Sequence, residues 1–330
     1  MSILNTDSQH DPNKILPIDY DWAREYYQNG VNNNWVPEEI PMADDVHQWE
    51  NDELTEAERQ LVEWNLGFFS TAESLTANNL VLAVYDHVTA PECRQYLLRQ
   101  AYEEAIHTDT FIYCCDSLGF EPEYLYGMYD RIPAIQQKDE FVVDLTRSID
   151  DPSFTVETDD DVRELLRDLV GFYVIMEGIF FYAGFAMMLA LKRRGKMVGV
   201  GEQFEYIMRD ESLHLNFGVD LINTIREEHP GVWTDEFEAE IDELIREAVE
   251  LESTYAKEAC PPDLMGMSAE GFVEYVEYIA DRRLTQLGMD ERFDTENPFP
   301  WMSEAVDLNR EANFFERQVT EYQSGGSLDW

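Results

Sequence analysis

The sequence contains two Glu-x-x-His units, Glu104-Ala-Ile-His107 and Glu211-Ser-Leu-His214, in otherwise apolar helical stretches. A spacing of three residues places both side chains on one face of a helix, about 60° apart, so each unit can chelate one metal ion. A single unit of this kind is common on the solvated face of an acidic helix. Two units on apolar helices instead favour a helical bundle that brings them together.

Two further acids stand alone in apolar helical segments, Glu73 in FFSTAESLTANNL and Glu177 in VIMEGIFF. Glu73 precedes Glu104 by 31 residues, and Glu177 precedes Glu211 by 34. One acid helix followed by one Glu-x-x-His helix, repeated, is the ligand set of a dinuclear carboxylate site in a four-helix core. Four carboxylates balance two divalent cations, whereas four buried acids without metal repel one another. Carboxylate and imidazole ligands together suit iron or manganese.

Helix start and stop signals along the chain predict an all-α fold. The predicted helices begin at the capping pairs Thr55–Glu58 and Thr158–Asp161 or at a proline such as Pro91, and they end at glycine or proline, as at Gly119. They cover residues 55–88, 91–119, 158–195, 198–230, 234–258 and 268–288, and a polar segment lies between 119 and 158. No stretch shows the two-residue alternation of a strand, and no repeat of solenoid length occurs.

Three parts of the chain differ in composition. Residues 1–50 contain four prolines and an Asn-rich patch at 32–34, which predicts an irregular N-terminal arm. Residues 51–305 contain the helical signals and are expected to form the main domain. Residues 306–330 end in TEYQSGGSLDW, where two glycines between polar residues predict a flexible C-terminal tail.

The net charge is −46, from 69 acidic and 23 basic residues, and only 5 of the basic residues are lysine. Such a field repels phosphate backbones and excludes nucleic-acid binding through a basic surface. Acidic excess with few lysines suits molar salt, where the Debye length is about 3 Å and self-repulsion is screened. The composition therefore predicts a protein from a salt-accumulating halophile, with an ordinary acidic protein as the alternative.

Three further patterns bear on compartment and membrane. The four cysteines show no CxxC spacing, so neither a disulfide framework nor a zinc site is expected. The N-terminal residues MSILNTDSQHDPNK lack an apolar signal core, which predicts a cytoplasmic protein. Residues 172–191 are apolar enough to mimic a membrane span, but they include Glu177 and no second such stretch follows. We therefore expect a helix buried within the bundle and no membrane partner.

At these residues the chain resembles the small (beta) subunit of class I ribonucleotide reductase, from about Trp35 to the C-terminus. The resemblance includes the two Glu-x-x-His units and the two lone acids. It also includes Trp35 in NNWVPEEIP, Asp210 directly before Glu211, and Tyr322 in the tail. It implies a ferritin-like helical bundle and a homodimer. Such a subunit uses O2 to make a one-electron oxidant at a metal pair and supplies it to the large (alpha) subunit, where ribonucleotides are reduced.

The resemblance also implies roles for individual residues. The metals would be held by Glu73, Glu104, His107, Glu177, Glu211 and His214. His107, Asp210 and Trp35 would form the inner part of a radical relay, and Tyr322 would carry the step at the subunit interface. The C-terminal tail would dock on the large subunit, as peptides with apolar anchors do. This makes the chain the radical-generating subunit of ribonucleoside-diphosphate reductase.

One position departs from the common pattern in a way that changes the chemistry. Most class I small subunits carry a radical-forming tyrosine four residues after the first histidine, whereas this chain has Phe111. Phenylalanine has no ionisable O–H and cannot store a neutral radical by losing a proton. Tyr113 is no replacement, because two helical steps rotate it by about 200° to another face. The oxidising equivalent is therefore expected to stay on the metals.

The first metal-binding acid differs as well, because Glu73 stands where the common iron-tyrosyl type has aspartate. Glu73 with Phe111 is the pattern of class Ic, which implies one manganese and one iron per chain. Both metals accept this ligand set, so two iron ions remain the alternative. Tyr206, five residues before Glu211, matches a tyrosine that helps electrons reach the class Ic cofactor during its assembly. Tyr206 is equally compatible with an ordinary packing role in the core.

Two other functions remain open for a dinuclear helical bundle. A ligand-binding Mn/Fe oxidase of the same superfamily also uses glutamate as its first ligand. The valine and tyrosine that are cross-linked in that group are replaced here by Thr76 and Phe172, and that group lacks a tyrosine-bearing tail. Non-enzymatic metal storage by a ferritin-like bundle would leave Trp35, Asp210 and the tail unexplained.

Overall fold

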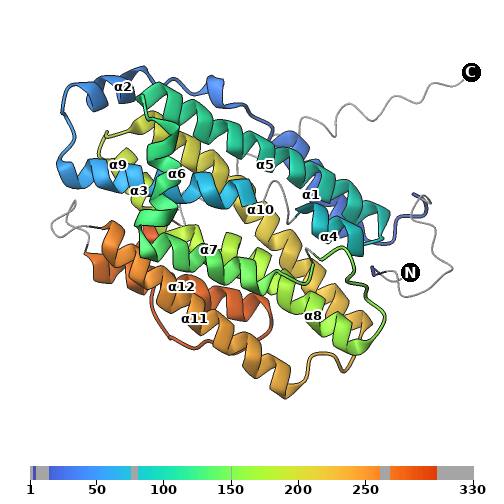
Figure 1. Cartoon of the computed structure of the whole chain (residues 1–330). Coiled ribbons are helices and arrows are strands. Elements are labelled where there is room, and N and C mark those ends of the chain that lie inside the picture. The colour runs from blue at the N-terminus through green and yellow to red at the C-terminus, as the bar shows by residue number, and fades with distance from the viewer. Residues whose placement is uncertain (1–2, 5–14, 76–80, 150, 261–267, 303–330) are drawn as a thin grey trace, which may run out of the picture.

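The computed structural model describes residues 3–4, 15–75, 81–149, 151–260 and 268–302. These residues form a bundle of helices, which confirms the predicted all-α fold (Figure 1). An isolated antiparallel bridge joins Leu4 to Val88, and no strand occurs within the described ranges. Thr76, Tyr322 and the predicted tail at 306–330 lie outside them.

Four long helical segments carry the residues that were predicted to bind metal. They are α3 (Glu56–Leu75), α5 (Pro91–Leu118), α10 (Val198–Glu228) and the rod made of α8 (Asp159–Leu169), η3 (Val170–Phe180) and α9 (Tyr182–Arg193). α10 packs along η3 and α9, and α3 packs against α5 and α9. These contacts close a four-helix core through the middle of the bundle (Figure 1).

The predicted starts and stops of the long helices are confirmed where the capping chemistry is local. Thr55 and Glu58 form the predicted capping box, with the Glu58 N–H 3.2 Å from Thr55 Oγ1 and the Thr55 N–H 2.9 Å from Glu58 Oε2. Thr158 caps α8 in the same way with Asp161. α5 ends at Gly119, which has a φ of 73°, a left-handed conformation that glycine adopts without a steric penalty.

The rod that begins at α8 is wholly buried over its apolar part. Its apolar window is long enough to cross a membrane by length and composition, yet every residue of that window is covered by the rest of the bundle. The expected buried helix is confirmed. The expected continuous α-helix is wrong in its middle, because η3 is a π-helix of 11 residues. The extra residue per turn shifts the side chains of η3 relative to those of a regular helix.

The N-terminal region is more ordered than predicted. α1 (Asp21–Asn32) and α2 (Ala43–Glu50) flank a short 3-10 turn, η1 (Pro37–Glu39), so the prediction of an irregular arm over 1–50 is wrong for these residues. α1 packs on α5 and α2 packs on α10. Because neither helix has a side-chain cap, this packing rather than a local signal accounts for their stability.

Two short helices, α6 (Pro122–Arg131) and α7 (Pro133–Leu145), occupy the segment between 119 and 158 that was expected to be a polar connection. α4 (Val81–His87) precedes α5 and lies within the helix that was predicted for residues 55–88. Pro133 begins a helix here rather than interrupting one, since proline in the first turn gives up no intrahelical hydrogen bond. α6 covers α3, and α7 packs against α11 and η3.

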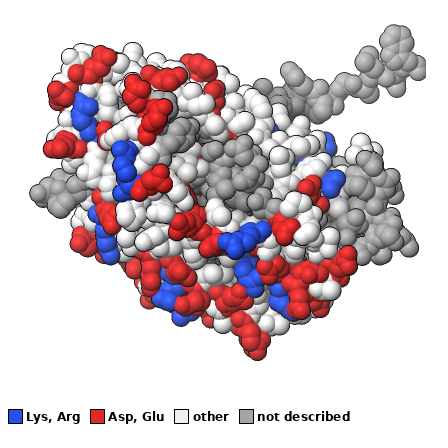
Figure 2. Space-filling model, in the orientation of Figure 1, with Lys and Arg blue, Asp and Glu red and all other residues white. Residues whose placement is uncertain are grey.

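α11 (Asp235–Ala259) and α12 (Ala269–Gln286) pack on each other and on η3, and form the lower edge of the molecule in Figure 1. Their predicted positions are confirmed to within a few residues. Acidic side chains are numerous along this edge, with groups of basic side chains among them, as Figure 2 shows.

Candidate metal centre

The structure brings all six predicted metal-binding residues together at the centre of the bundle. Glu73 comes from α3, Glu104 and His107 from α5, Glu177 from η3, and Glu211 and His214 from α10. Every one of them is fully buried. Four helices thus supply four carboxylates and two imidazoles to one region without water contact.

These side chains form two overlapping groups. Candidate ligand atoms of Glu73, Glu104, His107 and Glu211 lie within 4.8 Å of one another, as do those of Glu104, Glu177, Glu211 and His214. Glu104 and Glu211 belong to both groups, whereas each of the other four residues belongs to one. The arrangement therefore suits two neighbouring cations with two carboxylates between them.

The individual contacts show how closely the donor atoms converge. His107 Nδ1 lies 3.0 Å from Glu211 Oε1 and 3.4 Å from Glu73 Oε2. His214 Nδ1 lies 3.1 Å from Glu104 Oε1 and 3.4 Å from Glu211 Oε2. Both Nδ1 atoms and most of the carboxylate oxygens make no hydrogen bond with any described residue. Buried nitrogen and oxygen atoms that make no hydrogen bond reduce the stability of the fold unless a metal ion binds them, so the site fits a pair of metal ions.

When no metal ion is bound, protons supply the positive charge in the cluster, and the pKa values of its acids and histidines show which side chains hold those protons. Burial raises the pKa of Glu73 well above its usual range, and it does the same for Glu177, where the charge of Glu211 adds to the effect. Burial by itself would lower the pKa of His107 and His214, but the surrounding carboxylates outweigh it and raise both. Cations that enter this site must therefore displace protons.

Two residues predicted to belong to the relay, Asp210 and Trp35, lie directly behind His107, and Tyr206 lies next to Trp35. Asp210 Oδ2 lies 3.5 Å from His107 Nε2 and accepts a hydrogen bond of 2.7 Å from the indole N–H of Trp35. Burial would raise the pKa of Asp210, but its hydrogen bond with His107 and the charge of Arg209 lower it. The ring of Tyr206 stacks on Trp35, with 5.2 Å between ring centroids. A contiguous path thus joins His107 to Tyr206.

Phe111 lies in an aromatic layer beside the cluster. Its ring is buried and stacks on Phe69 at a centroid distance of 5.9 Å, with Phe204 edge-on at 5.8 Å. Tyr113 points elsewhere, since its hydroxyl donates to the Ile40 carbonyl at 3.2 Å. The rotation of Tyr113 to another face, predicted from helical geometry, agrees with this contact.

The residue that contacts the other histidine, His214, was not predicted from the sequence. Glu103 Oε2 lies 2.9 Å from His214 Nε2, and Glu103 is almost fully buried. A signal was present, because each Glu-x-x-His unit is preceded directly by an acid, Glu103 in one and Asp210 in the other. Spacing alone could not show that each acid serves the histidine of the opposite unit.

A second missed set of residues supports η3, which carries Glu177. The Gln100 side chain donates to Glu177 Oε1 at 3.2 Å and accepts from the Tyr173 hydroxyl at 3.1 Å. Two buried basic side chains donate to backbone carbonyls of η3. Arg283 donates to the Gly178 carbonyl at 2.8 Å, and Lys138 donates to the Phe180 carbonyl at 3.0 Å. Side chains from three neighbouring helices therefore hold the π-helix in place.

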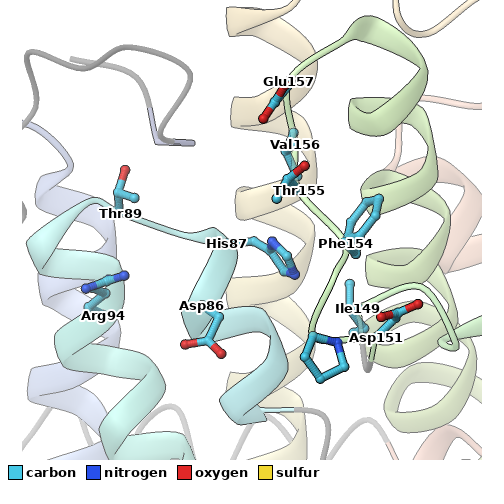
Figure 3. A pocket seen from close by; sticks show the side chains of 11 residues that line it. Asp86, His87, Thr89, Arg94, Ile149, Asp151, Phe154, Thr155, Val156 and Glu157 are labelled. Carbon is cyan, nitrogen blue, oxygen red and sulfur yellow. The ribbon is translucent and has the colours of Figure 1, made fainter.

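A surface pocket of about 410 Å³ lies away from this cluster (Figure 3). It opens between the end of α4, the start of α5, Ile149 and residues 151–157, and the ring of His87 lies against Phe154 there at a centroid distance of 5.1 Å. None of its lining residues was predicted to belong to the site. The candidate chemistry thus lies in the buried cluster.

Comparison with known proteins agrees with this assignment. A family model described as "Ribonucleotide reductase, small chain" matches residues 12–298. The chain is 53% identical over 323 residues to the ribonucleoside-diphosphate reductase subunit beta of Chlamydia pneumoniae, covering 98% of this chain and 93% of that protein. The solved ribonucleotide reductase R2 subunit from Clostridium botulinum superposes with a TM-score of 0.81 at 26% identity, covering 93% of this chain and 94% of that one. The Rnr4 homodimer of Saccharomyces cerevisiae shares the fold, with a TM-score of 0.75 at 23% identity over 97% and 92% of the two chains. The chain therefore belongs to the family of ribonucleotide reductase small chains, as a class I small (beta) subunit.

Proposed function

We propose that the buried cluster holds a dinuclear metal centre whose oxidising equivalent stays on the metals rather than on a tyrosine. Glu73 and His107 would bind one cation, Glu177 and His214 the other, and Glu104 and Glu211 would bind both. The observation that carries this proposal is the convergence of fully buried carboxylate oxygens and imidazole nitrogens, most of which have no hydrogen-bond partner among the described residues. Bound redox metals supply reaction with O2 and storage of one oxidising equivalent for the reduction of ribonucleotides.

The metal pair is proposed to be one manganese and one iron per chain, with two iron ions as the alternative. Phe111 supports the mixed pair, because its ring offers no hydroxyl that could hold the radical beside the cluster. The test is the Mn:Fe ratio of protein loaded anaerobically with both metals in high salt, oxygenated, and stripped of loosely bound metal. One manganese and one iron per chain would support the mixed pair. Two iron ions with negligible manganese would refute it and leave the dinuclear site intact.

The protein supports this centre by excluding water and holding its ligands. Trp35, Asp210 and His107 are proposed to form the inner relay, and their short contacts give it a continuous path. Tyr206 is proposed to pass electrons inward during cofactor assembly, since it stacks on Trp35 and is only half-buried. The phenylalanines around Phe111 shield the centre from water.

The relay is proposed to continue through Tyr322 in the tail, which would dock on the large subunit. Removing residues 321–330 tests this and separates a reductase subunit from a metal-storage protein. The truncated chain should take up metal and consume O2 normally but support no nucleotide reduction with the large subunit. Full reductase activity after truncation would refute tail docking. A Tyr322→Phe variant isolates the phenol from the rest of the tail.

We also propose that the protein works as a homodimer through the outer face of α5. Leu98, Tyr102 and Ile112 follow that face at helical spacing and are 55%, 44% and 51% exposed. An exposed apolar stripe on a chain of charge −46 marks a contact surface. Replacing Leu98 and Ile112 with glutamate should give a monomer in analytical ultracentrifugation. Val143→Glu changes a valine on α7 that is 45% exposed; it is the matched control and should remain dimeric.

The acidic surface supports a cytoplasmic protein adapted to molar salt. Self-repulsion among 69 acids weakens as the Debye length falls from about 10 Å at 0.1 M to about 3 Å at 1 M. The melting temperature should therefore rise steadily between 0.1 and 2 M KCl. A melting temperature that stays constant, or falls, over this range would refute salt adaptation.

A further inference from the structure

The Nε2 atom of each Glu-x-x-His histidine contacts an acid from the helix of the other unit, and we call this acid the outer partner of the histidine. Asp210, from α10, contacts His107 of α5, whereas Glu103, from α5, contacts His214 of α10. The corresponding distances to Nε2 are 3.5 Å and 2.9 Å. Each helix thus holds the histidine that belongs to the other helix.

An arginine accompanies each of these acids. Arg99 Nε lies 3.0 Å from Glu103 Oε1, and Arg209 Nη2 lies 3.1 Å from Asp210 Oδ1. The Arg99 side chain is 11% exposed, so the Glu103 carboxylate is neutralised in a largely dry environment. A buried carboxylate with both a guanidinium and an imidazole partner is held in one orientation.

Both arginines reach the same short segment of the chain. Arg209 donates to the Asn33 carbonyl, and Arg99 Nη1 donates to Asn34 Oδ1 at 3.1 Å. The next residue, Trp35, donates to Asp210. Three consecutive residues therefore tie down the outer partners of both histidines, which gives the Asn-rich patch a structural role.

The approach of α1 to this set depends on one glycine. A Cβ atom on Gly30 would lie 2.8 Å from Glu103 Oε1, which is closer than real Cβ contacts, and 3.0 Å from Arg99 Cγ, which is tighter than most of them. The missing side chain lets α1 cover the Glu103–Arg99 pair. The segment that follows α1 then carries Asn34 to Arg99.

We propose that Glu103, held by Arg99 and Asn34, is the positioning residue of His214 in the metal centre. By accepting the Nε2 proton, Glu103 leaves Nδ1 free to face a cation and makes the imidazole a stronger ligand. This inference rests on the proposed metal centre. It adds Glu103 as a residue that strengthens the binding of only one of the two metal ions.

The two outer partners differ in what they connect to. Asp210 also binds the indole of Trp35, which can be oxidised, whereas Glu103 ends on a guanidinium and an amide, which cannot pass an electron. The His214 side is thus anchored, and the His107 side is both anchored and joined to the relay.

The test is anaerobic titration of the full chain with Mn(II), with affinity and stoichiometry measured for each site. Wild-type protein should bind two ions, and Glu103→Ala should weaken one of them by about 10- to 100-fold while leaving the other unchanged. Glu103→Gln, whose amide oxygen can still accept from Nε2, should recover part of the loss. Glu92→Ala removes another buried acid of α5 away from the cluster and is the matched control.

A double variant shows whether Glu103 acts through His214. Adding Glu103→Ala to His214→Ala should not weaken metal binding further. A further loss in the double variant, equal weakening of both sites, or unchanged affinities in Glu103→Ala would overturn the inference. If Glu103→Ala fails to fold, the affinities of the two metal sites are compared in Glu103→Gln and Arg99→Met instead. Wild-type protein that binds no pair of ions would instead refute the metal centre itself.

Discussion

The indole N–H of Trp35 donates a 2.7 Å hydrogen bond to Oδ2 of Asp210, and the same oxygen lies 3.5 Å from Nε2 of His107. Residues from the N-terminal segment, α10 and α5 thus meet at one carboxylate oxygen. Trp35 is only 3% exposed, so the contact is shielded from water. Because Tyr206 stacks on Trp35, these contacts form a contiguous path from His107 to Tyr206.

Replacing Trp35 with phenylalanine should stop turnover without removing the metals. The substitution keeps a ring in the cavity but removes the donor to Asp210 and the oxidisable indole. We expect an unchanged metal content per chain and a loss of nucleotide reduction, measured with the large subunit. Trp49→Phe changes an indole on α2 that packs on Phe120 and should keep full activity. Full activity in Trp35→Phe would exclude Trp35 from the relay.

Metal uptake should strengthen as the pH rises. The raised pKa values of His107, His214, Glu73 and Glu177 mean that the metal-free site holds protons that cations must displace. Calorimetry in buffers of different ionisation enthalpy should show proton release on binding, and affinity should fall between pH 8 and pH 6. Affinity that does not change with pH would show that the site is already deprotonated.

Removing Lys138 should destabilise the fold strongly. Its ammonium lies 2.5 Å from Glu252 Oε2, donates to the Phe180 carbonyl, and stands over the rings of Phe68 and Tyr255. Lys138→Met keeps the side-chain length but leaves a buried acid and a carbonyl without a partner, which costs about 3–5 kcal/mol. Denaturant unfolding of metal-free protein measures the loss.

A second substitution at the partner of Lys138 provides the control. Lys138→Met combined with Glu252→Leu removes both charges, so most of the lost stability should return. If the double variant were as unstable as Lys138→Met, the cost would come from packing rather than from the unpaired acid.

Asp168 should make stability depend on pH in a predictable direction. Burial raises its pKa from 3.8 to about 7, although the Ile149 N–H donates to it at 2.7 Å and partly opposes the shift. The folded state therefore binds the proton more tightly than the unfolded state, and the contribution of Asp168 to stability is lost as the pH rises towards 7. Asp168→Asn keeps the acceptor without the charge.

The melting temperatures of wild type and Asp168→Asn, both metal-free and at constant salt, check this. The variant should melt about 3 °C or more above the wild type at pH 8.5, and the difference should shrink to roughly a third of that at pH 5, which lies about a third of the way from the unfolded to the folded pKa of Asp168. A difference that is the same at both pH values would show that the charge of Asp168 is not the cause.

Much of the fold could be predicted because the ends of several helices are determined by residues that are neighbours in the sequence. The Thr55–Glu58 and Thr158–Asp161 capping boxes and the left-handed Gly119 need only neighbouring residues, and all three are found as predicted. α1 and α2 were missed because their stability comes from packing on α5 and α10, which leaves no mark in their own sequence. The π-helix η3 was missed for the same reason, since side chains from other helices satisfy its carbonyls.

The spacing of residues identified the six acids and histidines, since positions three apart on a helix must share a face. It could not tell which carboxylates lie between two cations or that Glu103 serves His214, 111 residues away. Those relationships arise only when α3, α5, η3 and α10 pack around one centre. Helical periodicity is a property of the local backbone, whereas the pairing of side chains across helices depends on where the whole chain places those helices.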